Sequence, residues 1–100
     1  MFDLARVVGF DWDDGNARKT LDKHGVSQKE TEEVFLDPLL RVLVDERHCG
    51  REKRFHAYGE TAAGRKLQVS ITLRGDDTLI RVISTRPMSR KERARYEEET

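Results

Sequence analysis

The sequence predicts an α+β fold, with a small, mostly antiparallel sheet, two N-terminal helices packed on one face and a C-terminal helix. Two Ser-x-x-Glu capping boxes mark helix starts at Ser27 and Ser89. After Pro38 the apolar residues change from helical spacing to alternation, which indicates strands. Short turns containing glycine separate the alternating segments, as in consecutive hairpins. We expect residues 1–100 to form a single domain, because this length supports one core.

Boundary signals define the first three elements. An apolar and aromatic run is typical of a strand, Asp13 can cap the helix that follows, and Gly25 ends that helix. Ser27 opens a second helix, which Pro38 terminates because its ring disfavours helical geometry in the residue before it. The predicted elements are a strand over 7–13 and helices over 14–24 and 27–36.

Alternation of apolar and polar residues predicts four strands in the rest of the chain. The clearest lies at 66–74, where Leu67, Val69 and Ile71 alternate with polar residues. The run at 78–85 is too continuously apolar to have one buried face, which indicates a central strand. The predicted strands are 40–45, 53–58, 66–74 and 78–85, and a helix follows from Ser89 to about Glu98.

Charge is divided unevenly along the chain. The 19 Lys and Arg balance the 19 Asp and Glu, and this net charge of zero alone argues against a nucleic-acid partner. Residues 1–40 hold five basic and nine acidic residues, a net of −4, whereas residues 41–95 hold fourteen and seven, a net of +7. Such asymmetry indicates an anionic partner for the positive block. The alternative is an ordinary solvated surface.

Cysteine content and hydropathy exclude several classes of protein. Cys49 is the single cysteine, which excludes an intramolecular disulfide and a Cys-based zinc cluster. The three histidines lack the close spacing of zinc ligands, so we predict no metal site and no cofactor. No apolar run approaches the roughly 18 residues that span a bilayer, and no secretory signal is visible. We therefore expect a soluble, cytoplasmic protein that does not contact a membrane.

One face of the predicted sheet gathers residue types that suit a phosphodiester. Arginine binds phosphate, hydroxyl and amide groups bind the sugar, and an aromatic ring stacks on a base. A polar sheet face that simply contacts water is the alternative. The residues are Arg54, His56 and Tyr58 on one strand, Gln68, Ser70 and Thr72 on the next, and Arg81.

Two further clusters are candidates for function. Arg86 and Arg90 flank the start of the last helix, where backbone amides favour an anion, although pairing with the acidic residues of that helix is an equal alternative. Lys23 and His24 end the first helix. A histidine beside a lysine suits acid or base work, and it also suits a helix C-terminus, so the sequence does not decide between these roles.

Three groups of strings occur in a specific order and spacing. They are Phe10-Asp11-Trp12-Asp13; Lys23-His24-Gly25-Val26-Ser27 with Val34-Phe35-Leu36-Asp37-Pro38; and Ile83-Ser84-Thr85-Arg86-Pro87-Met88 with Glu92-Arg93 and Tyr96-Glu97. Together they resemble the BrnT toxins of bacterial type II toxin–antitoxin systems, over about residues 8–98. The resemblance implies a RelE-like fold and a ribonuclease that inhibits translation and growth. It also implies neutralisation by a co-encoded BrnA-type ribbon-helix-helix antitoxin, in a heterotetramer that binds operator DNA only through the antitoxin and represses its own operon.

The expected activity is endoribonuclease cleavage that needs no metal ion. Such cleavage requires a base for the ribose 2′-hydroxyl, cations for the phosphorane and an acid for the leaving 5′-oxygen. The candidates for proton transfer are His24, His56 and Glu52, without a ranking. The candidates for stabilising the phosphate are Arg54, Arg81 and Arg86, and those for binding the rest of the RNA are Tyr58, Arg90 and Arg93. Lys23 is either a phosphate contact or a base with lowered proton affinity.

Two other classes of function stay open at this point. The first is a catalytically inactive α+β module whose basic sheet face binds an acidic protein segment. The second is direct binding of operator DNA, although the sequence shows no recognition helix with base-reading residues. An assay of RNA cleavage separates the enzyme from both.

Overall fold

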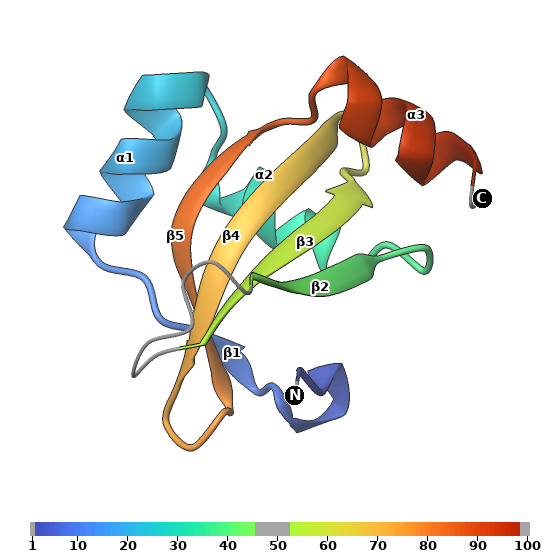
Figure 1. The fold of residues 1–100 in the computed structure, drawn as a ribbon. Coiled ribbons are helices and arrows are strands. Elements are labelled where there is room, and N and C mark those ends of the chain that lie inside the picture. Colours follow the sequence, from blue (N-terminus) through green and yellow to red (C-terminus); the bar gives the residue numbers. More distant parts are fainter. Residues whose placement is uncertain (1, 46–52, 99–100) are drawn as a thin grey trace.

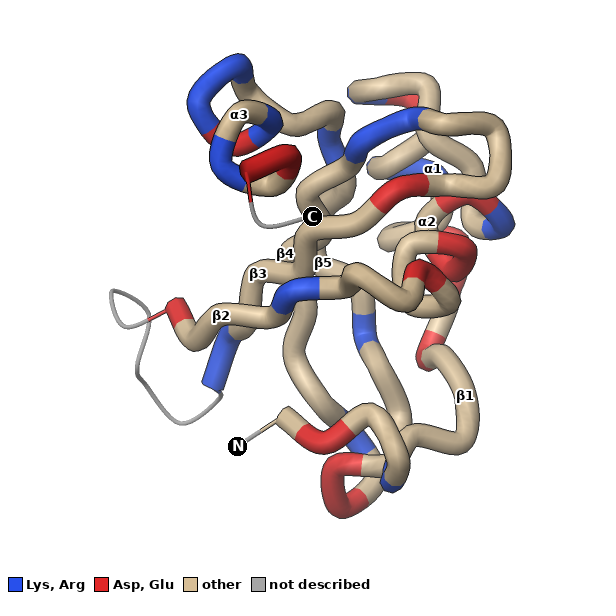
Figure 2. Tube along the Cα trace, turned by 90° about the vertical axis from the view of Figure 1, so that its right-hand side faces the viewer, with Lys and Arg blue, Asp and Glu red and all other residues tan. Residues whose placement is uncertain are grey.

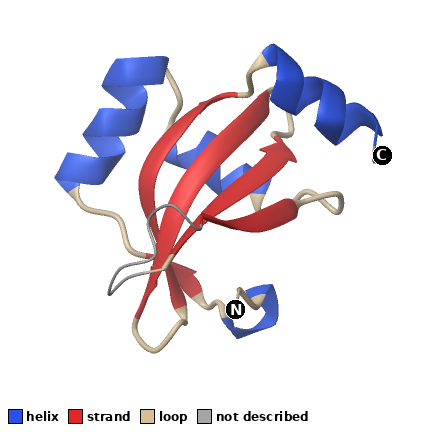
Figure 3. Cartoon of the chain, viewed as in Figure 1, coloured by secondary structure: helices blue, strands red, loops and turns tan. Residues whose placement is uncertain are grey.

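The computed structural model describes residues 2–45 and 53–98, and it consists of a five-stranded sheet with three α-helices (Figures 1 and 3). The strand order is β1-β5-β4-β3-β2. Only the β1–β5 pair is parallel, so the sheet is mostly antiparallel and the predicted α+β class is confirmed. The elements are a short 3-10 helix at Leu4–Arg6, then β1 Gly9–Phe10, α1 Asp14–His24, α2 Gln28–Val34, β2 Arg41–Asp45, β3 Arg54–Glu60, β4 Lys66–Arg74, β5 Leu79–Pro87 and α3 Arg90–Glu98.

Both predicted capping boxes form. At the start of α2, the Ser27 hydroxyl accepts from the Glu30 amide at 3.1 Å, and the Glu30 carboxylate accepts from the Ser27 amide at 3.1 Å. Ser89 and Glu92 make the same reciprocal pair before α3, at 3.1 and 2.8 Å. Asp13 caps α1, as expected. Local polar spacing therefore fixes where each helix begins.

The first strand is shorter than predicted. Only Gly9 and Phe10 pair with β5, and the chain then leaves the sheet toward α1. The buried Asn16 side chain explains this departure, because its amide donates to the carbonyl oxygens of Asp11 at 3.2 Å and Val82 at 3.1 Å. The start of α1 is thus held against β5, and residues 11–13 cannot continue the strand.

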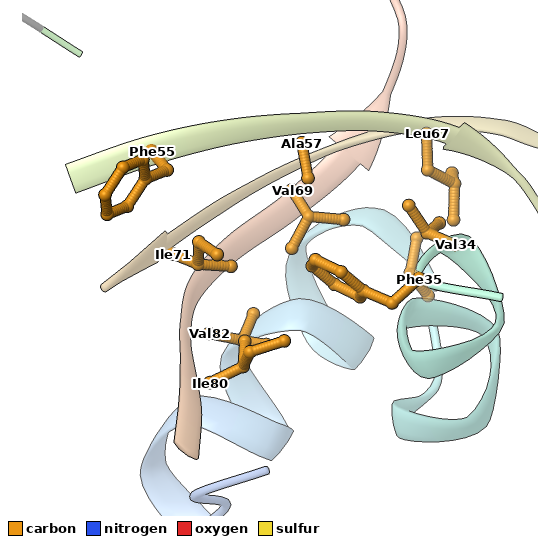
Figure 4. Packing of buried hydrophobic residues seen from close by; sticks show 10 residues of the cluster. Val34, Phe35, Phe55, Ala57, Leu67, Val69, Ile71, Ile80 and Val82 are labelled. Atoms are coloured by element: carbon orange, nitrogen blue, oxygen red, sulfur yellow. The ribbon is translucent and has the colours of Figure 1, made fainter. Parts of the chain in front are cut away.

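The core lies between the sheet and the helices α1 and α2, which occupy one side of it (Figure 4). A hydrogen bond of 3.1 Å between the hydroxyls of Thr31 and Thr85 ties α2 to β5 inside this core. Phe35 packs edge-on against Phe10, with ring centroids 5.5 Å apart. The buried cluster consists of Val26, Val34, Phe35, Phe55, Ala57, Leu67, Val69, Ile71, Ile80 and Val82.

An irregularity in β5 explains its continuous apolar run. Ser70 pairs with Ser84 but the next residue, Ile71, pairs with Val82, so Ile83 is an extra residue in β5. Alternation reverses at such a bulge. Val82 therefore faces the core, and Arg81 and Ser84 both belong to the opposite face.

The side of the sheet opposite α1 and α2, called here the polar face, carries the candidate site residues in three neighbouring rows across the strands. Residues two apart on one strand are about 7 Å apart, so neighbouring rows lie within reach of a single nucleotide. The Tyr58 row holds Arg41, Tyr58, Gln68 and Arg86; the His56 row holds Leu43, His56, Ser70 and Ser84; and the Arg81 row holds Asp45, Arg54, Thr72 and Arg81.

Candidate functional site

His56 lies in the middle of the polar face with both ring nitrogens hydrogen-bonded. Its Nε2 is 2.9 Å from Asp45 Oδ2, and its Nδ1 is 3.0 Å from Ser70 Oγ and 2.6 Å from Gln68 Nε2. A carboxylate only accepts and an amide nitrogen only donates, so neutral His56 carries its proton on Nε2 and accepts at Nδ1. Asp45 is only 9% exposed. The sheet thus holds a buried carboxylate against this imidazole.

Arg86 is held by Glu92 at the end of β5. The two guanidinium nitrogens Nη1 and Nη2 donate to Oε1 and Oε2 at 2.7 and 2.9 Å, and Nη1 also donates to the Pro87 carbonyl oxygen at 3.1 Å. Of the five N–H donors, Nε–H and the second one on Nη2 have no hydrogen-bond partner among the described residues. These two form the side fork of the guanidinium, which matches the oxygens of a phosphate.

This ion pair fixes the charge of both side chains at neutral pH. Hydrogen bonds from Arg86 lower the pKa of Glu92 from 4.5 to about 2. Burial raises this pKa, and the hydrogen bond from the Ser89 amide lowers it further. The same hydrogen bonds raise the pKa of Arg86. Burial raises the pKa of nearby Tyr58, and the charge of Glu92 raises it further. Tyr58 is therefore a neutral phenol beside a charged pair.

Helix α3 lies against the end of the polar face (Figure 1). Its Tyr96 is 5% exposed and donates a hydrogen bond to the carboxylate of Asp37, in the turn after α2. That carboxylate also accepts from the backbone amides of Leu39 and Glu60, each at 2.8 Å. A pocket of about 130 Å³ remains between the helix and the sheet. Its lining is Arg41, Leu43, Tyr58, Lys91, Glu92, Arg95 and Tyr96.

Besides Arg81, the polar face carries four of the sequence-predicted site residues: Arg54, His56, Tyr58 and Arg86. Arg81 belongs to this face too, in the row farthest from Arg86. Its guanidinium pairs with acidic residues at the start of α1, 2.8 Å from Asp13 and 3.5 Å from Asp11. Hydrogen bonding to Asp13 raises the pKa of Arg81. Arg81 is thus engaged by carboxylates in this structure.

Other predicted residues lie elsewhere. Lys23 and His24 occupy the last turn of α1, in the helical layer, and the sheet separates this layer from the polar face (Figure 4). The structure therefore does not bring them together with His56. Arg90 and Arg93 are exposed on α3. Glu52 lies outside the described residues.

Sequence reasoning missed two of the carboxylates that hold these groups, those of Asp45 and Asp37, whereas it offered pairing of Arg86 with the acidic residues of the last helix as an alternative, which the contact with Glu92 confirms. Asp45 ends the predicted strand 40–45, and a hairpin register would have placed it beside the next strand's polar residues. The contact between Tyr96 and Asp37 joins residues 59 apart in the chain and has no local signal.

Basic and acidic residues are grouped in different parts of the fold, as they are along the sequence. Lys and Arg mark much of α3, whereas Asp and Glu mark α2 and the segment near the N-terminus (Figure 2). Among residues 2–45 and 53–98, no group of three or more His, Cys, Asp or Glu is arranged to hold a metal ion. No helix within these ranges has the length and apolar character to cross a membrane.

Residues 12–92 match a family model described as ribonuclease toxin, BrnT, of type II toxin-antitoxin system. The matched range runs from Trp12 to Glu92 and contains α1, α2 and strands β2 to β5. It includes the whole of the His56 row and the ion pair that holds Arg86. No curated protein matches the sequence.

Proposed function

We propose that this chain, which belongs to the BrnT family of ribonuclease toxins, cleaves RNA on its polar face without a metal ion. The arrangement of His56 and Arg86 carries the proposal. A histidine backed by a buried carboxylate lies one row from an arginine whose side fork is open. Tyr58 follows His56 on the same face of β3 and shares the row of Arg86, with Gln68 of β4 between them.

The reaction joins the ribose 2′-oxygen to phosphorus and breaks the bond from phosphorus to the 5′-oxygen. His56 takes the proton of the 2′-hydroxyl at Nδ1, where Ser70 and Gln68 now donate. The carboxylate of Asp45 stabilises the imidazolium that forms and keeps the ring oriented. The products are a 2′,3′-cyclic phosphate and a 5′-hydroxyl, which receives its proton from a general acid.

Arg54 and Arg86 stabilise the negative charge that builds up on the phosphorane. Glu92 positions Arg86 and leaves its side fork for two phosphate oxygens. Arg90 and Arg93, exposed on α3, bind the flanking phosphates. His24 and Lys23 receive no step in this scheme, because the sheet separates them from the phosphate.

The type II description of the family implies a protein antitoxin. We propose a co-encoded BrnA-type antitoxin that neutralises the toxin in the cytoplasm by covering the polar face. In a heterotetramer with an antitoxin dimer, the antitoxin alone contacts operator DNA and represses the operon. Co-purification of the two proteins, followed by operator binding with and without the toxin, tests this part separately.

Cleavage by the purified chain in EDTA tests the enzymatic proposal. We expect a 2′,3′-cyclic phosphate product, and we expect Arg54→Ala and Arg86→Ala each to lower the rate roughly 10²- to 10³-fold. Arg18→Ala is the matched control, because Arg18 is exposed on α1. Unchanged cleavage in both variants would refute the site. A folded wild type without cleavage would instead favour the inactive interaction module.

A further inference from the structure

The pocket between α3 and strands β2 and β3 has no part in the bond-breaking steps above. Its volume is about 130 Å³, and the rings of Tyr58 and Tyr96 with the side chain of Leu43 give it a mostly apolar wall. An engineered cavity of about 150 Å³ holds one benzene ring. The pocket is somewhat smaller than that cavity and is open to solvent, so it can take the edge of one planar ring while the rest of the ring stays outside.

The walls of this pocket are held in place. Tyr96 is 5% exposed and bonded to Asp37, which two backbone amides hold in turn. On the other side, the ion pair of Arg86 and Glu92 ties the first turn of α3 to β5. Such a preformed site loses little entropy when a rigid ring enters.

Cations surround the apolar wall. Arg41, Lys91 and Arg95 line the pocket, whereas the charge of Glu92 is neutralised by Arg86. This combination suits an anionic ligand with a flat, uncharged part. It does not suit an aliphatic peptide, which offers no negative charge to Lys91 and Arg95.

The position of the pocket favours a nucleotide chain among anionic ligands, and the proposed ribonuclease function makes that chain RNA. Tyr58 and Arg86 belong to the same row and are separated only by β4, so their backbones are about 10 Å apart. One nucleotide spans such a gap with its base at Tyr58 and its phosphate at Arg86.

We propose that this pocket binds one base of the RNA, next to the cleaved phosphate, with Tyr58 stacking on the base and Lys91 and Arg95 binding the neighbouring phosphates. The inference rests on the proposed ribonuclease function and adds a base-binding subsite to it.

Binding of uncleavable RNA by the full chain tests this subsite. The probes are 2′-O-methyl hexanucleotides of A, C, G or U and an abasic hexamer with the same number of phosphates, at one ionic strength. We expect at least one base-bearing hexamer to bind roughly 5- to 150-fold more tightly than the abasic hexamer. Tyr58→Ala should bring this ratio close to one, and Tyr58→Phe should retain it.

Two further variants distinguish binding of a base in the pocket from general attraction of RNA to positive charge. Leu43→Trp fills the pocket from an exposed position and should abolish the preference for bases while Tyr58 is intact. Lys91→Ala should weaken binding of every hexamer, the abasic one included. Lys19→Ala on α1 is its matched control and should leave all affinities unchanged.

Each outcome decides between the two proposals. A wild type that cleaves RNA but binds abasic and base-bearing hexamers equally overturns the subsite and leaves the proposed function. A wild type that neither cleaves nor binds any hexamer overturns both. Loss of antitoxin binding in Leu43→Trp, with the preference for bases intact, would make the pocket a protein interface and overturn the subsite.

Discussion

Removal of the Glu92 charge tests the ion pair that holds Arg86 and the first turn of α3. A pKa of about 2 in place of 4.5 corresponds to about 3 kcal/mol of stability if the ion pair were fully shielded from water. The Arg86 side chain is 39% exposed, so we reduce this value to about 1–2 kcal/mol. Glu92→Gln should therefore lower the melting temperature by about 5–10 °C at pH 7.

The direction of the pKa shift of Glu92 determines how the stability difference between wild type and Glu92→Gln changes with pH. The folded-state pKa of Glu92 is lowered, so its contribution is fully present above pH 4.5 and is lost as the pH falls toward 2. In urea unfolding followed by Trp12 fluorescence, the difference between wild type and Glu92→Gln should disappear over this range. The control is Glu98→Gln, an exposed charge on the same helix, which should change stability by less than about 0.5 kcal/mol. A difference that stays constant from pH 7 to pH 2 would refute the assignment.

Substitutions at three other positions test the packing that places the site. Gly59→Ala would put a Cβ 2.8 Å from the carbonyl oxygen of Val34, so we expect a loss of about 2–3 kcal/mol in urea unfolding, and a neutral effect would contradict the close approach of β3 to α2. Tyr96→Phe removes the hydrogen bond to Asp37 and should cost about 1.5–3 kcal/mol. Burial raises the pKa of Asp37, but its hydrogen bonds outweigh this effect and hold the pKa below its ordinary value. NMR titration of the Tyr96→Phe variant should therefore show a higher pKa for Asp37. Gly25 ends α1 in the left-handed conformation, with φ of 63° and open space around it. Gly25→Ala should therefore lower the free energy of unfolding by about 1 kcal/mol, and Gly25→Asn should lower it by less. Equal losses for the two variants in thermal unfolding would show that the left-handed conformation does not determine the stability at this position.

Much of the fold could be predicted because its signals are local. Ser27 with Glu30 and Ser89 with Glu92 satisfy each other's backbone within three residues, so both helix starts can be read from the sequence. The alternation in β4 likewise needs only its own residues. The ambiguity of the 78–85 run was also informative, because the extra residue Ile83 breaks the period there.

The candidate site was less predictable, because its contacts join distant segments. Asp45 reaches His56 only once β2 and β3 have paired, and Tyr96 reaches Asp37 across 59 residues. The family resemblance, by contrast, identified the chain from short strings, and the family match over residues 12–92 confirms it. The grouping of His24 with the arginines of the sheet stays a prediction of the sequence that the fold does not support, since α1 lies in the other layer.

The folded structure shows that the charge blocks seen in the sequence are partly neutralised by contacts between them. The basic block after residue 40 and the acidic block before it are partly paired, because Arg81 contacts Asp13 at 2.8 Å and Arg65 contacts Glu30 at 2.7 Å. These pairs reduce the field that the sequence alone attributes to the sheet. In the proposed site, RNA affinity depends less on the summed charge than on groups of fixed geometry, namely the side fork of Arg86 and the ring of Tyr58. A nucleotide chain is distinguished from other polyanions in the proposed site because only a nucleotide places a base and a phosphate at both groups at once, and the 2′-hydroxyl that His56 is proposed to deprotonate distinguishes RNA from DNA.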